Sequence, residues 1–203
     1  LVARDAFNGV ILWKKPMKKW HSHLWPLKSG PTQLARRLVA VKDRVYITLG
    51  VDEPVSVLDA ATGELIHELP DSKGAEEIIV EGGQVFVLES PEEWELNSFL
   101  PFHNTGDQAR IRRDFAWNKK KRDVKAYDSV TGKRIWGHNN KVAPLTMTAD
   151  EHRVFFHDGE KVVALNRSSG DVAWSAGKSF LPETVRFNFG PKLVIHDGVV
   201  LYA

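Results

Sequence analysis

Short runs of alternating apolar residues, each followed by a glycine turn and a second short run, occur four times in the chain. The four segments are LVARDAFNGVILW (Leu1 to Trp13), VSVLDAATGELIH (Val55 to His67), VKAYDSVTGKRIW (Val124 to Trp136) and VVALNRSSGDVAW (Val162 to Trp174). The alternation indicates a half-buried strand, and glycine supplies the positive φ that a tight hairpin requires. Each segment is therefore predicted to form a β-hairpin.

Aligned on their glycines, the four segments keep similar residue types at fixed positions. The aligned glycines are Gly9, Gly63, Gly132 and Gly170. Four residues before them stand Asp5, Asp59, Asp128 and Asn166, and four residues after them stand Trp13, His67, Trp136 and Trp174. An Asp or Asn at a strand end can hydrogen-bond the backbone of the turn. An indole can bury a large area and still donate one N–H.

A second hairpin pattern alternates with the first along the chain. Its copies are LVAVKDRVYIT (Leu38 to Thr48), IIVEGGQVFVL (Ile78 to Leu88), LTMTADEHRVFFH (Leu145 to His157) and LVIHDGVVLYA (Leu193 to Ala203). Their predicted turns are Lys42-Asp43, Gly82-Gly83, Asp150-Glu151 and Asp197-Gly198, which are typical of hairpins. Two hairpins make a unit of four antiparallel strands, A to D, and repeats of this unit predict an all-β fold, the β-propeller.

The spacing of the units predicts two long insertions. The aligned glycines are 54, 69 and 38 residues apart, and only the last interval fits a bare blade of about 40 residues. We expect insertions at about residues 14–37, between strands D and A, and 89–123, between strands B and C. The predicted domain is a partial propeller over residues 1–203, with whole blades at about 34–68, 76–136 and 144–174 and a half-blade at each end. The remaining blades of a parent propeller are expected partners.

Composition removes several classes of function. The chain of 203 residues has no cysteine, which excludes disulfides, thiolate metal sites and cysteine nucleophiles. Its net charge of +2 does not indicate a nucleic-acid partner. No apolar run approaches the roughly 20 residues that a membrane-spanning helix needs, so no transmembrane segment is expected. Hydrolase and nucleotide-binding motifs are also absent from the sequence.

The pattern A-x-D-x-x-[TS]-G-x-x-x-W resembles the tryptophan-docking repeat of the pyrroloquinoline-quinone (PQQ) propeller family. The resemblance covers nearly the whole chain outside the insertions; His67 departs at the tryptophan position and Asn166 at the aspartate position. It implies that Trp13, Trp136 and Trp174 pack against neighbouring blades. Most members are exported, which implies a periplasmic or exported location, and a cytoplasmic location stays open.

The same resemblance implies different functions, because the family holds both enzymes and scaffolds. We expect a non-catalytic module for ligand or protein binding and assembly, with no catalytic residue and no cofactor. The alternative is part of a PQQ-dependent dehydrogenase, with PQQ and calcium near the ring axis, or a propeller fused to a separate catalytic domain. No set of residues here matches the dehydrogenase sites, and the vicinal cysteine pair that several such enzymes carry is missing.

The insertions are the candidate binding face. Connections B–C and D–A leave a four-stranded meander on one face, so both insertions are expected there, and long loops on rigid scaffolds often bind partners. The candidate residues are Trp20, His21, His23, Trp25, Arg110, Arg112, Arg113 and Trp117. This basic and aromatic set suits a protein or an anionic or sugar-like ligand. Alternatively, the aromatic residues anchor the loops to the ring. No metal site is predicted, since no suitably spaced carboxylate accompanies the histidines.

Overall fold

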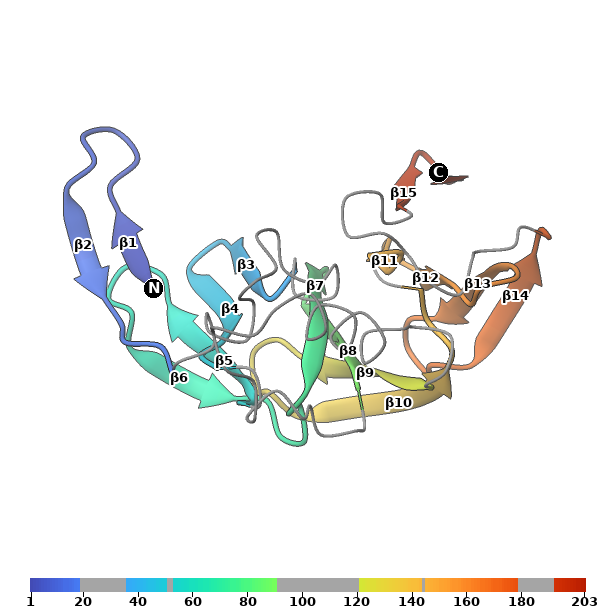
Figure 1. Cartoon of the computed structure of the whole chain (residues 1–203), viewed down its shortest axis with the longest axis horizontal. Helices are drawn as coiled ribbons and strands as arrows, with labels where there is room; N and C mark the ends of the chain where they lie inside the picture. The colour runs from blue at the N-terminus through green and yellow to red at the C-terminus, as the bar shows by residue number, and fades with distance from the viewer. Residues whose placement is uncertain (19–35, 51–52, 91–120, 144, 179–191) are drawn as a thin grey trace, which may run out of the picture.

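The structure, a computed structural model, describes residues 1–18, 36–50, 53–90, 121–143, 145–178 and 192–203. All regular secondary structure within these ranges is β-strand. The strands form five antiparallel sheets in chain order, and the sheets follow one another along an open arc (Figure 1). Three sheets have four strands and two have two strands. The predicted all-β propeller, with three whole blades and two half-blades, is confirmed.

Each sheet takes its strands in chain order, as a meander does. The first blade contains β3 (Leu38–Val41), β4 (Arg44–Thr48), β5 (Val55–Asp59) and β6 (Leu65–Glu68). The second contains β7 (Ala75–Glu81), β8 (Gln84–Glu89), β9 (Arg122–Asp128) and β10 (Arg134–Asn140). The third contains β11 (Thr148–Ala149), β12 (Arg153–His157), β13 (Val162–Asn166) and β14 (Val172–Ala176). The N-terminal half-blade is β1 (Val2–Arg4) with β2 (Ile11–Lys14), and the C-terminal half-blade is β15 (Leu193–His196) with β16 (Val199–Tyr202).

The turns between strands A and B follow the predicted positions in three of four copies. Lys42-Asp43 joins β3 to β4, Gly82-Gly83 joins β7 to β8, and Asp197-Gly198 joins β15 to β16. The fourth turn is longer than the predicted Asp150-Glu151. Ala149 pairs with Val154, and the Asp150 side chain accepts hydrogen bonds from the N–H groups of His152 and Arg153. An aspartate of this kind stabilises a wider turn.

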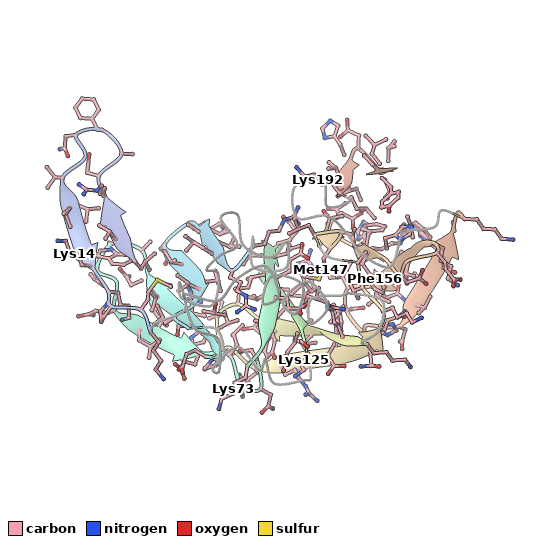
Figure 2. The ribbon with its side chains drawn as sticks, viewed as in Figure 1. Lys14, Lys73, Lys125, Met147, Phe156 and Lys192 are labelled. Carbon is pink, nitrogen blue, oxygen red and sulfur yellow. The ribbon has the colours of Figure 1, made fainter. Side chains whose placement is uncertain are left out.

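The hydrophobic core lies between neighbouring blades. One cluster joins Phe86 and Trp136 of the second blade to Phe156 of the third, and Met147 fills the same layer (Figure 2). Another joins the first blade to the second, and further clusters join each half-blade to its neighbour. Each whole blade therefore buries both faces of its sheet.

The prediction that the strands before the glycine turns are half-buried is wrong for the middle strands of the whole blades, which are buried on both faces. Residues Val55 to Leu58 of β5 are all buried, and so are Val124 to Tyr127 of β9. The middle strands of a blade have a neighbouring blade on either side, so both sets of side chains are covered. The alternation of apolar residues correctly indicated strands, but it did not indicate which faces of the sheets are exposed to solvent.

Candidate functional site

The candidate binding residues of the insertions lie outside the described residues. This applies to Trp20, His21, His23, Trp25, Arg110, Arg112, Arg113 and Trp117. What the structure does describe is the strand ends from which the insertions leave and to which they return. β8 ends at Glu89 and β9 begins at Arg122, on either side of the second insertion. Arg36 follows the first insertion and leads into β3.

These strand ends contain a group of mostly buried charges, here called the root cluster. It consists of Arg36, Glu76, Glu77, Glu89, Arg122 and Lys125. The two glutamates at the start of β7 are adjacent, and a β-bulge lies there, because Ala75 pairs with Glu89 while Glu77 pairs with Leu88. A bulge lets a strand redirect consecutive side chains.

Arg36 connects three blades near the inner strands. Its guanidinium donates to Glu77 Oε1 of the second blade at 2.8 Å and to the Met147 carbonyl, just before the third blade, at 2.9 Å. Its own carbonyl accepts the Ile78 N–H at 2.9 Å. Burial raises the pKa of Glu77 to about 7, although Arg36 acts in the opposite direction. The Glu77 side chain is 1% exposed, so burial outweighs the ion pair.

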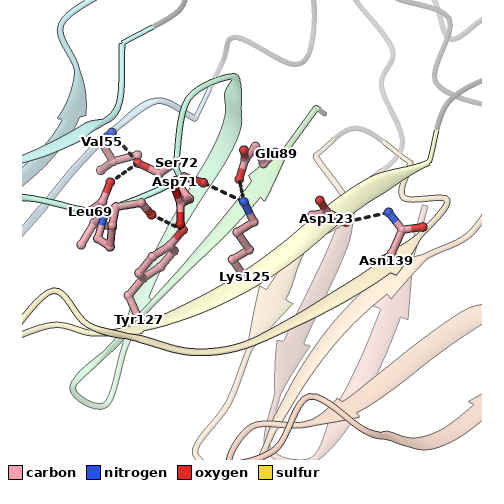
Figure 3. Close-up of polar contacts among 10 residues, drawn as sticks. Val55, Leu69, Asp71, Ser72, Glu89, Asp123, Lys125, Tyr127 and Asn139 are labelled. Atoms are coloured by element: carbon pink, nitrogen blue, oxygen red, sulfur yellow. Dashed lines mark hydrogen bonds and ion pairs between the residues drawn. The ribbon is translucent and has the colours of Figure 1, made fainter. Parts of the chain in front are cut away.

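Two further ion pairs lie beside the second insertion. Arg122 Nε is 2.5 Å from Glu76 Oε2, and both side chains are almost fully buried. Lys125 Nζ is 2.5 Å from Glu89 Oε2 and donates to the Asp71 carbonyl at 2.7 Å (Figure 3). Burial raises the pKa of Glu89 despite the nearby ammonium.

The connection between the first and second blades is fixed to the same region. The Tyr127 hydroxyl donates to the Pro70 carbonyl at 3.0 Å (Figure 3). The Ser72 hydroxyl donates to the Leu69 carbonyl and accepts the Val55 N–H, each at 2.8 Å. Burial raises the pKa of Tyr127, so the hydroxyl keeps its proton and remains a donor. The root cluster thus pairs each of its three carboxyl groups with a cation.

The ion pairs limit the chemistry that the root cluster can perform. The carboxylates are held by cations, so they are poor candidates for metal ligands or for a free general base. Within the described ranges, no three His, Asp or Glu side chains are grouped so that they could hold a metal ion. In the same part of the chain, no helix has the length and apolar character needed to cross a membrane.

The docking residues are those four positions after the aligned glycines, and two of them, Trp13 and Trp136, lie at blade boundaries. The Trp13 ring covers Gly63 of the first blade so closely that a Cβ there would lie 2.6 Å away, and the Trp136 ring covers Gly170 of the third blade in the same way. Trp13 Nε1 donates to the Ala60 carbonyl at 2.9 Å. Trp136 Nε1 donates to the Arg167 carbonyl at 2.7 Å. We propose that these contacts hold neighbouring blades together.

Trp174 and Gly9 lie at the two ends of the repeat series. The Trp174 ring lies against Phe155 of its own blade, with ring centroids 5.8 Å apart. In the described structure, no atom lies within 4 Å of the position that a Cβ on Gly9 would take. The interblade contact expected for Trp174 therefore stays a prediction.

A β-bulge precedes the docking residue in every copy. In the first blade, Val57 pairs with His67 while Leu58 pairs with Leu65, so Ile66 is the extra residue. The other three copies skip the corresponding residue in the same way. Because a bulge bends and twists its strand, it helps to turn the docking ring toward the next blade. No sequence signal marked this feature.

The aspartates that precede the glycines close the turns. Asp59 Oδ1 accepts hydrogen bonds from the N–H groups of Ala61 and Thr62 and from the Thr62 hydroxyl. Asp5 and Asp128 accept the corresponding backbone bonds in their own turns. The bonds from Thr62 hold the pKa of Asp59 below its usual value. Gly63 has φ of +73°, which fits the predicted need for glycine.

Two sets of polar contacts in the structure were not identified from the sequence. The root cluster was one, although charged residues inside otherwise apolar strands, as in AEEIIVE of β7, could have marked it. Arg167 was the other. Its guanidinium donates to Gln84 Oε1 and to the carbonyls of Glu81, Gly82 and Asp150, which ties the second blade to the third.

Comparison with known proteins gives one family and several similar folds. The model of the PQQ_2 family, described as outer membrane protein assembly factor BamB, matches residues 1–177. No curated protein sequence matches the chain significantly. The computationally designed Ika4 protein is similar at a TM-score of 0.53 and 12% identity, covering 81% of each chain.

Two natural proteins of known structure are also similar. Quinohemoprotein alcohol dehydrogenase from Comamonas testosteroni has a TM-score of 0.55 and 14% identity, over 99% of this chain and 36% of that one. BamB from Moraxella catarrhalis has a TM-score of 0.47 and 15% identity, over 79% of this chain and 43% of that one. The chain thus spans less than half of the length of either protein. At 14% identity, the likeness to the dehydrogenase concerns the fold alone.

Proposed function

Because the chain belongs to the PQQ_2 family of β-propeller proteins, we propose that it is a non-catalytic module that binds a partner protein during assembly of a larger complex. The family description, an outer-membrane protein assembly factor, supports an assembly role. The observation that carries the proposal is the root cluster. Its ion pairs join the strand ends that lie beside the two insertions.

The root cluster does not fit the cofactor that quinoprotein members of this fold use. Such members hold PQQ with a calcium ion, and calcium needs six to eight oxygen ligands. The buried carboxylates of Glu76 and Glu77 instead face arginines, at 2.5 and 2.8 Å. An arginine within hydrogen-bond distance competes with a cation for the same oxygens. No catalytic step is therefore assigned to this part of the ring.

The first insertion and the end of the second favour an acidic partner, because both are rich in basic residues. The first insertion carries Trp20 and Trp25 among basic residues and has no acidic residue. The second begins with acidic residues and ends in a mainly basic stretch that includes Arg110, Arg112 and Arg113. Arginine and tryptophan are enriched among the residues that dominate protein interfaces, and a basic surface speeds association with an acidic one. We therefore propose that the module recognises an acidic peptide segment of its partner protein.

A binding assay with a defined probe tests this function. The full chain is titrated into a fluorescein-labelled poly-glutamate peptide at several salt concentrations, with fluorescence anisotropy as the readout. A variant with Arg110, Arg112 and Arg113 changed to Gln is expected to bind at least about tenfold more weakly, which is 1.4 kcal/mol.

The matched control removes the same charge from the opposite face. It changes Lys42, Lys133 and Arg153 to Gln, three exposed residues at or beside the tight turns. Its affinity is expected to equal that of the wild type. Equal losses in both variants would show non-specific attraction and would contradict a binding face at the insertions.

The proposal also places the protein in the periplasm or another exported location. The support is the family description, which refers to the outer membrane. Fractionation of the source cells, followed by immunodetection of the chain, tests this placement. Recovery of the protein with cytoplasmic markers would contradict it.

A further inference from the structure

The boundary between the first and second blades differs from the other two docking boundaries. Its docking residue is His67, whose ring covers Gly132 so closely that a Cβ there would lie 2.6 Å from Cδ2. The boundaries on either side use Trp13 and Trp136. The residue type at this one position therefore changes from an indole, which does not titrate, to an imidazole, which does.

The hydrogen bond of the docking ring is also replaced at this boundary. Trp13 and Trp136 donate to the carbonyl of the residue that follows Asp59 and Asn166. The corresponding carbonyl after Asp128 belongs to Ser129, and it accepts a hydrogen bond from the Arg44 guanidinium of the first blade. In the described structure, the buried Nε2 of His67 has no hydrogen-bond partner.

A neutral imidazole tolerates this environment better than a charged one. Both ring nitrogens of a protonated histidine are donors, and a buried donor without an acceptor destabilises the folded state. Burial lowers the pKa of His67, and the Arg44 cation acts in the same direction. Asp128 of the second blade acts in the opposite direction. Val57, which faces His67 across the sheet, is apolar.

We propose that His67 makes the first–second blade boundary acid-sensitive, because a protonated imidazole beside Arg44 leaves its position over Gly132 and loosens the contact between the blades. The docking rings of Trp13 and Trp136 keep their positions under the same conditions. The transition is local, and the sheets on either side stay folded.

This change would regulate the proposed binding, a consequence that rests on the proposed function. The first insertion leads into the first blade, and the second insertion interrupts the second blade. The His67 boundary therefore lies between the two blades that carry them. Loosening this boundary shifts the strand ends that precede and follow the insertions, so acidic peptide affinity is expected to fall with the same pH dependence.

Other titrating groups near the blade boundaries also change the free energy of unfolding with pH, so a measurement of global stability would not isolate His67. Glu77, at the inner end of the same boundary, has a raised pKa, so its protonation on acidification favours the folded state. His138, near Phe156 at the next boundary, has a pKa lowered by burial. Global stability would combine these opposing effects. A local probe of the Gly132 turn avoids this problem.

The test compares hydrogen exchange in wild type and His67→Phe at pH 7.5 and pH 5.5, after correction for the intrinsic pH dependence of exchange. Phenylalanine keeps a ring over Gly132 and cannot take up a proton. Its lack of an N–H leaves no carbonyl unpaired, because Arg44 already donates to the Ser129 carbonyl. In the wild type, the peptide spanning 128–133 is expected to exchange severalfold faster at pH 5.5, up to about tenfold, which is the limit for one histidine of ordinary pKa in the loosened state. In His67→Phe, the acid-dependent increase is expected to disappear.

Two further variants make the outcome decisive. His67→Trp restores the residue of the other copies and replaces His67→Phe if that variant does not fold. Trp136→His places a titrating ring where the Arg167 carbonyl can accept its N–H, so the turn around Gly170 is expected to show less acid-dependent exchange than the Gly132 turn of the wild type. Equal pH dependence in wild type and both His67 variants would overturn the proposal.

Peptide binding is measured separately on the same proteins. If exchange changes as expected while the poly-glutamate peptide never binds, the boundary is acid-sensitive and the proposed function is wrong. If the peptide binds but neither exchange nor affinity responds to His67, the binding function stands and the acid-sensitive boundary is refuted.

Discussion

Trp136 provides the most informative single substitution in the ring. Its side chain is only 7% exposed, and its ring lies 6.0 Å from the Phe86 ring, centroid to centroid. It also covers Gly170 of the next blade and donates to the Arg167 carbonyl. Trp136→Ala therefore removes packing from two blades and one hydrogen bond between them.

The expected loss follows from these contacts. Truncation of a buried tryptophan to alanine typically destabilises a protein by about 3–5 kcal/mol. The lost hydrogen bond is worth about 1 kcal/mol of this. We expect Trp136→Ala to lower the free energy of unfolding by about 4 kcal/mol. Trp136→Phe, which keeps a ring and removes the N–H, is expected to lose about 1–2 kcal/mol.

Equilibrium urea unfolding of the full chain, followed by circular dichroism, measures both losses. Trp174→Ala is the matched control, because the half-buried Trp174 ring lies against Phe155 of its own blade. Its expected loss is smaller, about 1–2 kcal/mol. A loss below about 1 kcal/mol for Trp136→Ala, or an equal loss in the control, would refute the view that this tryptophan holds blades together.

Three further substitutions address the packing and the root cluster. Gly170→Ala places a Cβ 2.6 Å from the Trp136 ring at φ of +78°, so we expect a loss of about 2 kcal/mol or more in urea unfolding; an unchanged midpoint would contradict the close contact. Glu76→Gln removes the charge that faces buried Arg122 and is expected to cost about 3–5 kcal/mol in the same assay; a neutral effect would show that the pair adds nothing. The pKa of Glu77 is raised to about 7, so the wild type should lose stability relative to Glu77→Gln as pH rises from about 4.5 to 7; parallel stability curves from pH 4 to 8 would contradict this.

The repeat was predictable because one short pattern encodes several local interactions at once. Asp59 accepts the turn N–H groups, Gly63 takes the positive φ, and the residue four positions later packs onto the next blade. These interactions occupy fixed offsets, so a single sequence reveals them. The β-bulge at Ile66 was not predictable, because it depends on how the ladder pairs rather than on residue type.

The polar contacts between blades were harder to predict for a different physical reason. Arg44 and Ser129 are 85 residues apart, and Arg36 and Met147 are 111 apart. Such pairs leave no local spacing pattern in one sequence. The substitution of His67 for tryptophan was visible, but its consequence depended on Arg44, which only the folded arrangement brings to the same carbonyl.

The most direct test of the central claim, that the ring is a binding module and not a quinoprotein, is a titration of the full chain with PQQ. Tryptophan fluorescence is followed with and without calcium, and dye reduction is then assayed with short-chain alcohols and sugars. We predict no calcium-dependent binding up to high micromolar PQQ and no dye reduction. Tight, calcium-dependent binding together with dye reduction would contradict the account and would place a catalytic site in the ring.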